Sequence, residues 1–101
     1  MQKSLVSEAL GTFILVFSGT GAMAIGAITG EPGHVGIALT FGFVIVALIY
    51  SFAHISGAHF NPAVSVAFWV MGEFEKSKVL PYIAAQIVGA ILASYSLYFL
   101  L

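Results

Sequence analysis

The stretch His54–Ser65, "HISGAHFNPAVS", lies inside a segment, Pro32–Gly72, that contains no Lys, Arg, Asp or Glu. Its "SGA" has the composition of a loop, and Asn61 followed by Pro62 normally begins a turn. The uncharged segment is 41 residues long. As a single helix it would measure about 60 Å, about twice the hydrocarbon thickness of a bilayer. The chain must therefore break within this segment, and the break signals lie in the quoted stretch.

The composition of the chain excludes a soluble domain. Of its 101 residues 60% are hydrophobic and 7% are charged, and the mean hydropathy is +1.09, whereas a soluble domain is about a quarter charged. We therefore expect residues 1–101 to form a single membrane domain. The absence of Cys excludes disulfides and thiol chemistry, and no basic patch indicates a nucleic-acid partner.

The apolar segments divide into full spans and one short piece. Three segments are long enough, as helices, to cross a hydrocarbon core of about 30 Å: about 4–28, about 35–54 and about 78–101. Between the last two, residues of about 55–71 hold the loop and a helix from Pro62 of only about 15 Å. The charged segment of about 72–77 belongs in water. The expected fold class is all-α membrane, with three transmembrane helices plus one re-entrant half-helix.

The lysines indicate the orientation. Lys3, Lys76 and Lys78 are the only basic residues. If the short piece enters and leaves on the same side, all three lie on one face, which the positive-inside bias makes cytoplasmic. If it crossed fully, they would be divided between two faces. We therefore expect a multi-pass protein of the cytoplasmic or plasma membrane, with its N-terminus inside and the loop at 29–35 outside.

Small residues recur four positions apart in two of the spans. Ala38 and Gly42 do so in the second span, and Ala85, Gly89 and Ala93 do so in the third. This spacing allows helix backbones to approach closely in lipid. It predicts close helix contacts along both stripes.

An Asn-Pro half-helix at membrane depth predicts a water-filled path. Irregular backbone is tolerated there only if it is buried in protein or lines a cavity. Asn61 is a favoured N-cap and Pro62 fits the first helical position, so the amide oxygen accepts a helix N–H and the NH₂ group is left as a donor. The positive end of the helix dipole repels cations. Extended backbone before it can supply carbonyl acceptors, an arrangement that suits a single file of water or a small alcohol.

At these residues the chain resembles the aquaporin and glycerol-facilitator family. "SGAHFNPAVS" resembles the first Asn-Pro-Ala loop of that family, while "SEALGTFILVF" and "PYIAAQIVGAILA" resemble its first and third helices. The family fold is an inverted repeat of six tilted helices and two half-helices. The resemblance therefore implies the first repeat of the aquaporin fold. It also implies a second half of the channel as the missing partner, a homotetramer when complete, and no cofactor or metal.

The resemblance also implies roles for individual residues. The motif residues Asn61, Pro62 and Ala63 would present Asn61 as the pore donor, and the pore carbonyls would be those of Gly57, Ala58 and His59. Phe41, in "ALTFGF", falls where the family takes an aromatic residue from its second helix into the outer selectivity constriction. A Phe there resembles water channels, whereas glycerol facilitators tend to have Trp.

Three further polar residues are expected to support the loop. A carboxylate in an apolar span is costly and usually functional, and the resemblance implies that Glu8 bonds the backbone N–H groups of the re-entrant loop. Gln86 would be a strut between a helix and the loop. His54 is expected to be a hydrogen-bonded packing residue.

The sequence thus predicts a passive water channel, with two alternatives. One is a facilitator for glycerol or another small neutral solute. The other is a fragment of a broken-helix secondary transporter, which needs an ion-coupling carboxylate, and Glu8 near a span end is the only candidate. An enzyme would have to use Glu8, His54 and His59. The two histidines are five apart, unlike the i, i+4 pair of HExxH, so we expect no enzyme.

Overall fold

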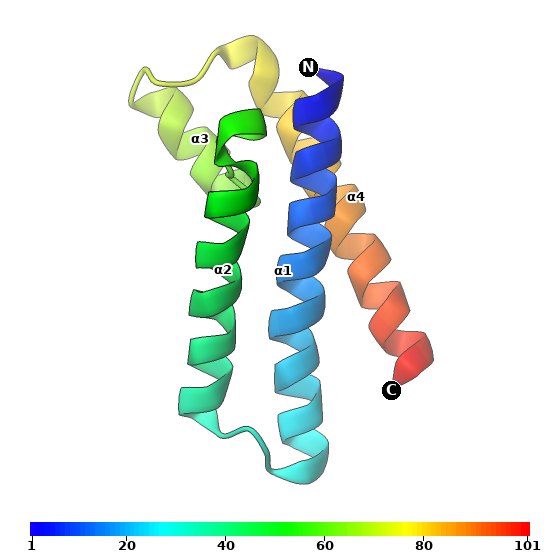
Figure 1. Ribbon diagram of the computed structural model, residues 1–101. Coiled ribbons are helices and arrows are strands. Elements are labelled where there is room, and N and C mark those ends of the chain that lie inside the picture. The colour runs from blue at the N-terminus through cyan, green and yellow to red at the C-terminus, as the bar shows by residue number, and fades with distance from the viewer.

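All 101 residues are described by the computed structural model, whose only regular elements are four helices (Figure 1). These are α1 (Gln2–Thr29), α2 (His34–Ser56), α3 (Pro62–Val70) and α4 (Lys76–Leu100). The three longer helices are long and apolar enough to cross a membrane. The expected fold class, three long apolar helices plus one short helix, is therefore confirmed.

Glycine and asparagine set the helix ends around the loop. α2 continues to Ser56, two residues beyond the expected end at about 54, because the left-handed residue that closes it is Gly57, with φ 88° and its N–H bonded to the carbonyl of Ala53. Glycine adopts this conformation without a steric penalty. Asn61 is extended and its Oδ1 accepts the N–H of Ala63 at 2.8 Å, so α3 starts with a side-chain cap.

The short helix α3, which follows α2 and precedes α4 in the sequence, turns back into the molecule. α1 packs against both α2 and α4, and α3 packs on α4. The N-terminus and the α3–α4 connection lie at one end of the molecule, and the α1–α2 connection lies at the other (Figure 1). α2 therefore ends, and α4 begins, at the same end. The segment 57–70 enters and leaves there, so the chain runs the length of the molecule three times.

The small residues of α4 pack closely, whereas those of α2 do not. A Cβ placed on Gly89 would overlap with the carbonyl oxygen of Ala9 on α1, and Ala93 is fully buried. On α2, Ala38 is exposed and a Cβ on Gly42 would have no atom within 4 Å. The prediction of close helix contact at the small residues of α2, Ala38 and Gly42, is therefore wrong for this chain.

Several polar side chains are buried, and many large apolar side chains are exposed. Exposed large apolar residues are found on every helix. The buried polar residues are Ser7, Glu8, Thr12, Ser56, Ser65 and Gln86. Soluble proteins bury apolar groups and rarely bury a carboxylate, whereas polar groups of membrane helices face the bundle interior. The distribution fits a chain surrounded by lipid.

Candidate functional site

The carboxylate of Glu8 lies beneath the loop between α2 and α3 and accepts four hydrogen bonds. Oε1 accepts from the N–H of Phe60 and from Nε2 of Gln86, each at 2.8 Å. Oε2 accepts from Oγ of Ser56 at 2.7 Å and from the N–H of His59 at 3.1 Å. The Glu8 residue is 0% exposed. Burying a carboxylate is costly unless it is hydrogen-bonded, and here both oxygens are fully used by donors.

The loop backbone adopts an unusual conformation that turns its N–H groups toward this carboxylate. Gly57, Ala58 and Phe60 all lie in the left-handed region, with φ of 88°, 56° and 55°, which is disfavoured for residues other than glycine. The N–H of Ala58 donates to Oγ of Ser56 at 3.2 Å, and the next two N–H groups donate to the carboxylate. Successive N–H groups that converge in this way form an anion-binding nest, whose bonds hold the strained conformation.

The same bonds fix the direction of the loop carbonyls. In a trans peptide the N–H and C=O groups point in opposite directions. The three N–H groups that point toward Glu8 and toward Oγ of Ser56 belong to the same peptide units as the carbonyls of Gly57, Ala58 and His59. These three carbonyls therefore point away from Glu8. These three residues also line a cavity of about 400 Å³ together with Asn61. The structure thus brings together the residues whose carbonyls were predicted from the sequence to be hydrogen-bond acceptors in a pore.

A second cavity adjoins the first at Asn61. It measures about 300 Å³ and its lining includes Phe41 and Asn61, and both cavities are lined by Leu15, Phe60 and Asn61. Oδ1 of Asn61 is used in the helix cap, so its NH₂ group is the part available to a molecule in the groove. We call the two adjoining cavities the Asn61 groove.

Two aromatic rings that line the groove, those of Phe60 and Phe41, pack directly against glycines of α1. A Cβ on Gly11 would overlap with the ring of Phe60, and a Cβ on Gly19 would overlap with the ring of Phe41. Phe60 also makes an edge contact with Phe52, with ring centroids 6.2 Å apart. α1 therefore fixes the position of Phe41 by close contact.

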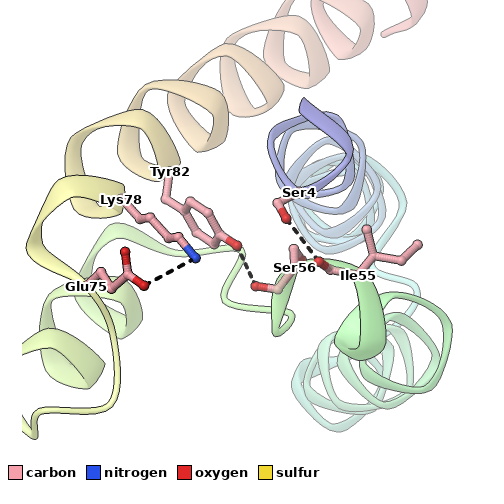
Figure 2. A network of polar contacts seen from close by, with 6 residues as sticks. All are labelled: Ser4, Ile55, Ser56, Glu75, Lys78 and Tyr82. Carbon is pink, nitrogen blue, oxygen red and sulfur yellow. Dashed lines mark hydrogen bonds and ion pairs between the residues drawn. The ribbon is translucent and has the colours of Figure 1, made fainter. Parts of the chain in front are cut away.

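The end of α2 is held by side chains from α1 and α4 (Figure 2). Oγ of Ser4 on α1 donates to the carbonyl of Ile55 at 3.0 Å, and the hydroxyl of Tyr82 on α4 donates to the carbonyl of Ser56 at 2.7 Å. The last carbonyls of a helix have no partner within the helix, so these two bonds satisfy them. The ion pair between Lys78 and Glu75, at 3.9 Å, is exposed and adds little stability.

Gln86 joins the support beneath the loop to the half-helix. Besides Glu8, its Nε2 donates to Oγ of Ser65 on α3 at 3.0 Å. Glu8 and Gln86 were predicted from the sequence as supports of the loop, whereas Ser56, Ser65 and Tyr82 were not. Two of these are hydroxyl residues that flank the Asn-Pro pair within an uncharged segment, a weak signal that could have drawn attention to them.

His54 differs from the expectation. It is exposed on α2 and its side chain makes none of the hydrogen bonds in the structure. Because α2 remains helical to Ser56, the two positions are separated by about 200° around the helix axis. Ser56 faces Glu8, so His54 faces away from the loop, and its assignment as a loop support is corrected.

Comparison with known proteins shows the family of the chain. The chain matches the Major intrinsic protein family over residues 1–101. Aquaporin Z from Photorhabdus laumondii is 46% identical over 100 residues, covering 97% of this chain and 43% of that protein. Aquaporin NIP3-1 from Arabidopsis thaliana is 45% identical over 93 residues, covering 91% of this chain and 29% of that protein.

A solved structure shows the same fold. The X-ray structure of the aquaglyceroporin from Plasmodium falciparum superimposes with a TM-score of 0.87 at 35% identity, covering 98% of this chain and 41% of that chain. The chain thus spans less than half the length of these relatives, and it corresponds to their N-terminal portion. It is an integral, multi-pass membrane protein, and it belongs to the major intrinsic protein family.

Proposed function

We propose that this chain is the first half of a passive water channel and that the Asn61 groove is its share of the pore. The observation that carries the proposal is the arrangement at the loop. Three carbonyls point away from Glu8 beside a cavity that ends at the free NH₂ group of Asn61. The family match also supports the expectation that the chain is not an enzyme.

The arrangement suits neutral molecules that both donate and accept hydrogen bonds. A water molecule can donate to the carbonyls of Gly57, Ala58 and His59 and then accept from Asn61. The N-terminus of α3, capped by Asn61 with Pro62 at its first position and the N–H of Ala63 next to it, carries a partial positive charge. That charge disfavours cations while it tolerates neutral solutes.

Water is favoured over glycerol by Phe41. Its ring lines the part of the groove of about 300 Å³, and Gly19 seats it there. A Phe at this position resembles water channels, whereas glycerol facilitators tend to have Trp, and a Phe ring offers no hydrogen bond to a polyol. The relatives do not decide the solute, because their names include both aquaporin Z and an aquaglyceroporin. A facilitator for small neutral solutes remains the second candidate.

A secondary transporter is less favoured because of Glu8. It is the only carboxylate inside the long helices, and all of its acceptor sites are occupied by donors from the protein. A coupling ion would have to break this arrangement in each cycle. The carboxylate therefore supports the loop in our proposal and binds no ion.

The complete channel would need a second half to cover the groove. α3 packs only on α4, and its Val70 is 74% exposed. α2 buries only Leu48 and Ser56, so its apolar surface is open to lipid or to other copies. The expected homotetramer, and an orientation with the N-terminus in the cytoplasm, are parts of this proposal.

The test uses the chain joined to the C-terminal half of a family member. Asn61→Asp should raise proton and cation flux, because a carboxylate offsets the positive end of the helix dipole. Water flux is measured by stopped-flow light scattering on proteoliposomes, with proton flux in parallel. Glu73→Gln, in the exposed α3–α4 connection, is the matched control. Water and ion fluxes that are unchanged by Asn61→Asp would contradict the pore role.

A further inference from the structure

The imidazole of His59 is held firmly on several sides. Its ring stacks on Phe68, with centroids 4.9 Å apart and an angle of 21°, and Phe74 meets it edge-on at 4.6 Å. The ring of Tyr82 lies 5.1 Å away. Nδ1 is 2.8 Å from Oγ of Ser65. These contacts, from α3, α4 and the connection between them, leave the ring one orientation.

The hydrogen bonds of Ser65 indicate which nitrogen of His59 carries the proton. Oγ of Ser65 is also 3.0 Å from Nε2 of Gln86, and an amide nitrogen can only donate. The amide cannot be reversed, because the same Nε2 donates to Oε1 of Glu8 at 2.8 Å, where an amide oxygen would face the carboxylate. Ser65 therefore accepts from Gln86, and its own proton has Nδ1 of His59 as its acceptor.

The alternative tautomer leaves a buried group without a partner. If Nδ1 carried the proton, the Ser65 oxygen would accept from both His59 and Gln86. The Ser65 proton would then have no acceptor, although the Ser65 residue is 0% exposed. An unpaired buried donor is unfavourable, so the neutral form with the proton on Nε2, which gives the buried Ser65 proton an acceptor, is the favoured form.

We propose that Ser65, oriented by Gln86, fixes His59 with its proton on Nε2, and that this N–H is a second side-chain donor of the Asn61 groove. Nε2 lies beside Gly57, where an added Cβ would be 3.3 Å away. Gly57 and His59 both line the cavity of about 400 Å³. The inference rests on the proposed function for its use by a permeating molecule, while the position of the proton does not depend on that function. Ser65 is a positioning residue in this arrangement.

The experiment is solid-state NMR, with ¹⁵N-labelled histidine, on the chain joined to the C-terminal half of a family member and reconstituted in bilayers, so that the groove is covered by protein. His59→Asn assigns the signals, and the exposed His34 and His54 serve as internal references. At neutral pH we expect His59 to show an unprotonated Nδ1, a protonated Nε2, and magnetisation transfer from water to the Nε2 proton. A proton on Nδ1, or an Nε2 proton without water contact, would overturn the proposal.

Two substitutions separate the role of the hydroxyl from simple packing. Ser65→Thr keeps the hydroxyl and should keep the single tautomer, whereas Ser65→Ala removes it and should give a mixture of two tautomers at His59. An unchanged single tautomer in Ser65→Ala would rule out positioning by Ser65. None of these readouts requires conduction, so a failure of the flux experiment with Asn61→Asp would be distinguishable from a failure here.

Discussion

Nε2 of Gln86 on α4 donates a hydrogen bond of 2.8 Å to Oε1 of Glu8 on α1, across 78 positions of the sequence. Both residues are buried, with exposed fractions of 1% and 0%. The bond joins two long helices directly under the loop that carries Asn61. Since Glu8 also accepts two loop N–H groups, the position of the loop depends on the way in which α1 and α4 pack.

The first prediction concerns the carboxylate. Glu8→Gln places an NH₂ group where an oxygen accepts two donors, so those donors lose their acceptor and a further donor is buried. Each buried donor left unpaired costs about 1–3 kcal/mol, and we expect the free energy of unfolding to fall by at least about 2 kcal/mol. Unfolding by SDS in detergent micelles, followed by far-UV circular dichroism, measures this quantity.

The matched control for the carboxylate is Glu73→Gln. Glu73 lies in the exposed α3–α4 connection, so its change should leave stability within about 0.5 kcal/mol of the original chain. If Glu8→Gln were as stable as Glu73→Gln, the four donors around Glu8 would not contribute to the stability of the fold.

The second prediction concerns the contact between α1 and α4. Gly89→Ala would bring a Cβ onto the carbonyl oxygen of Ala9, and a backbone atom cannot move aside as a side chain can. The two helices must therefore separate, and we expect a loss of about 1–3 kcal/mol, as is typical of overpacking. Gly42→Ala is the control, because its Cβ would have no neighbour within 4 Å. Equal stabilities for the two variants would argue against the close approach at Gly89.

The sequence sufficed for the helices because their signals are local. The length of the apolar segments and the positions of the charges require three spans and a break. Asn61 and Pro62 mark the start of the half-helix by cap chemistry alone. The left-handed Gly57 moved the end of α2 only slightly, to Ser56.

The partners of the loop could not be predicted in the same way. Ser56, Ser65 and Tyr82 matter because of residues far along the chain, and no local pattern shows which hydroxyl will meet Glu8 or Gln86. His54 was predicted to support the loop, but its side chain makes no hydrogen bond to it. Its position near the motif suggested a support role, but helical rotation turns it outward. Tertiary packing decided the positions of Ser56, Ser65 and Tyr82, whereas the rotation of α2 decided that of His54.

The third prediction concerns topology. α2 ends and α4 begins at the end of the molecule that holds the N-terminus (Figure 1), so single cysteines at Gln2 and Ser77 should react from the same side of the membrane. A cysteine at Gly33, in the connection at the opposite end, should react from the other side. All three positions are exposed. Labelling of inside-out and right-side-out vesicles with an impermeant maleimide reads the result.

The lysine bias further predicts that Gln2 and Ser77 face the cytoplasm. Reaction of Ser77→Cys from the same side as Gly33→Cys would mean that the segment of α3 crosses the membrane. That outcome would contradict the return of the chain at Asn61.

The fourth prediction concerns the chain by itself. Its groove is formed by α1, α2, α4 and the loop with α3, and no element lies on the far side of Asn61, which is exposed. The polar groups of the loop would then face lipid, where an unsatisfied group costs several kcal/mol. We therefore expect the 101 residues to insert but not to conduct, with an osmotic water permeability equal to that of empty liposomes.

Two copies could close the groove only if they inserted in opposite orientations. Half of them would then carry Lys3, Lys76 and Lys78 outside, which the positive-inside bias opposes. Two such copies would also bring two Phe41 rings and no Arg to the constriction, because the chain contains no Arg. Stopped-flow measurements on the reconstituted chain, with Asn61→Asp in parallel, distinguish a half-channel that does not conduct from an assembly of oppositely inserted copies. Permeability well above the lipid background that is lost in the Asn61 variant would contradict the half-channel reading and indicate an assembly of oppositely inserted copies.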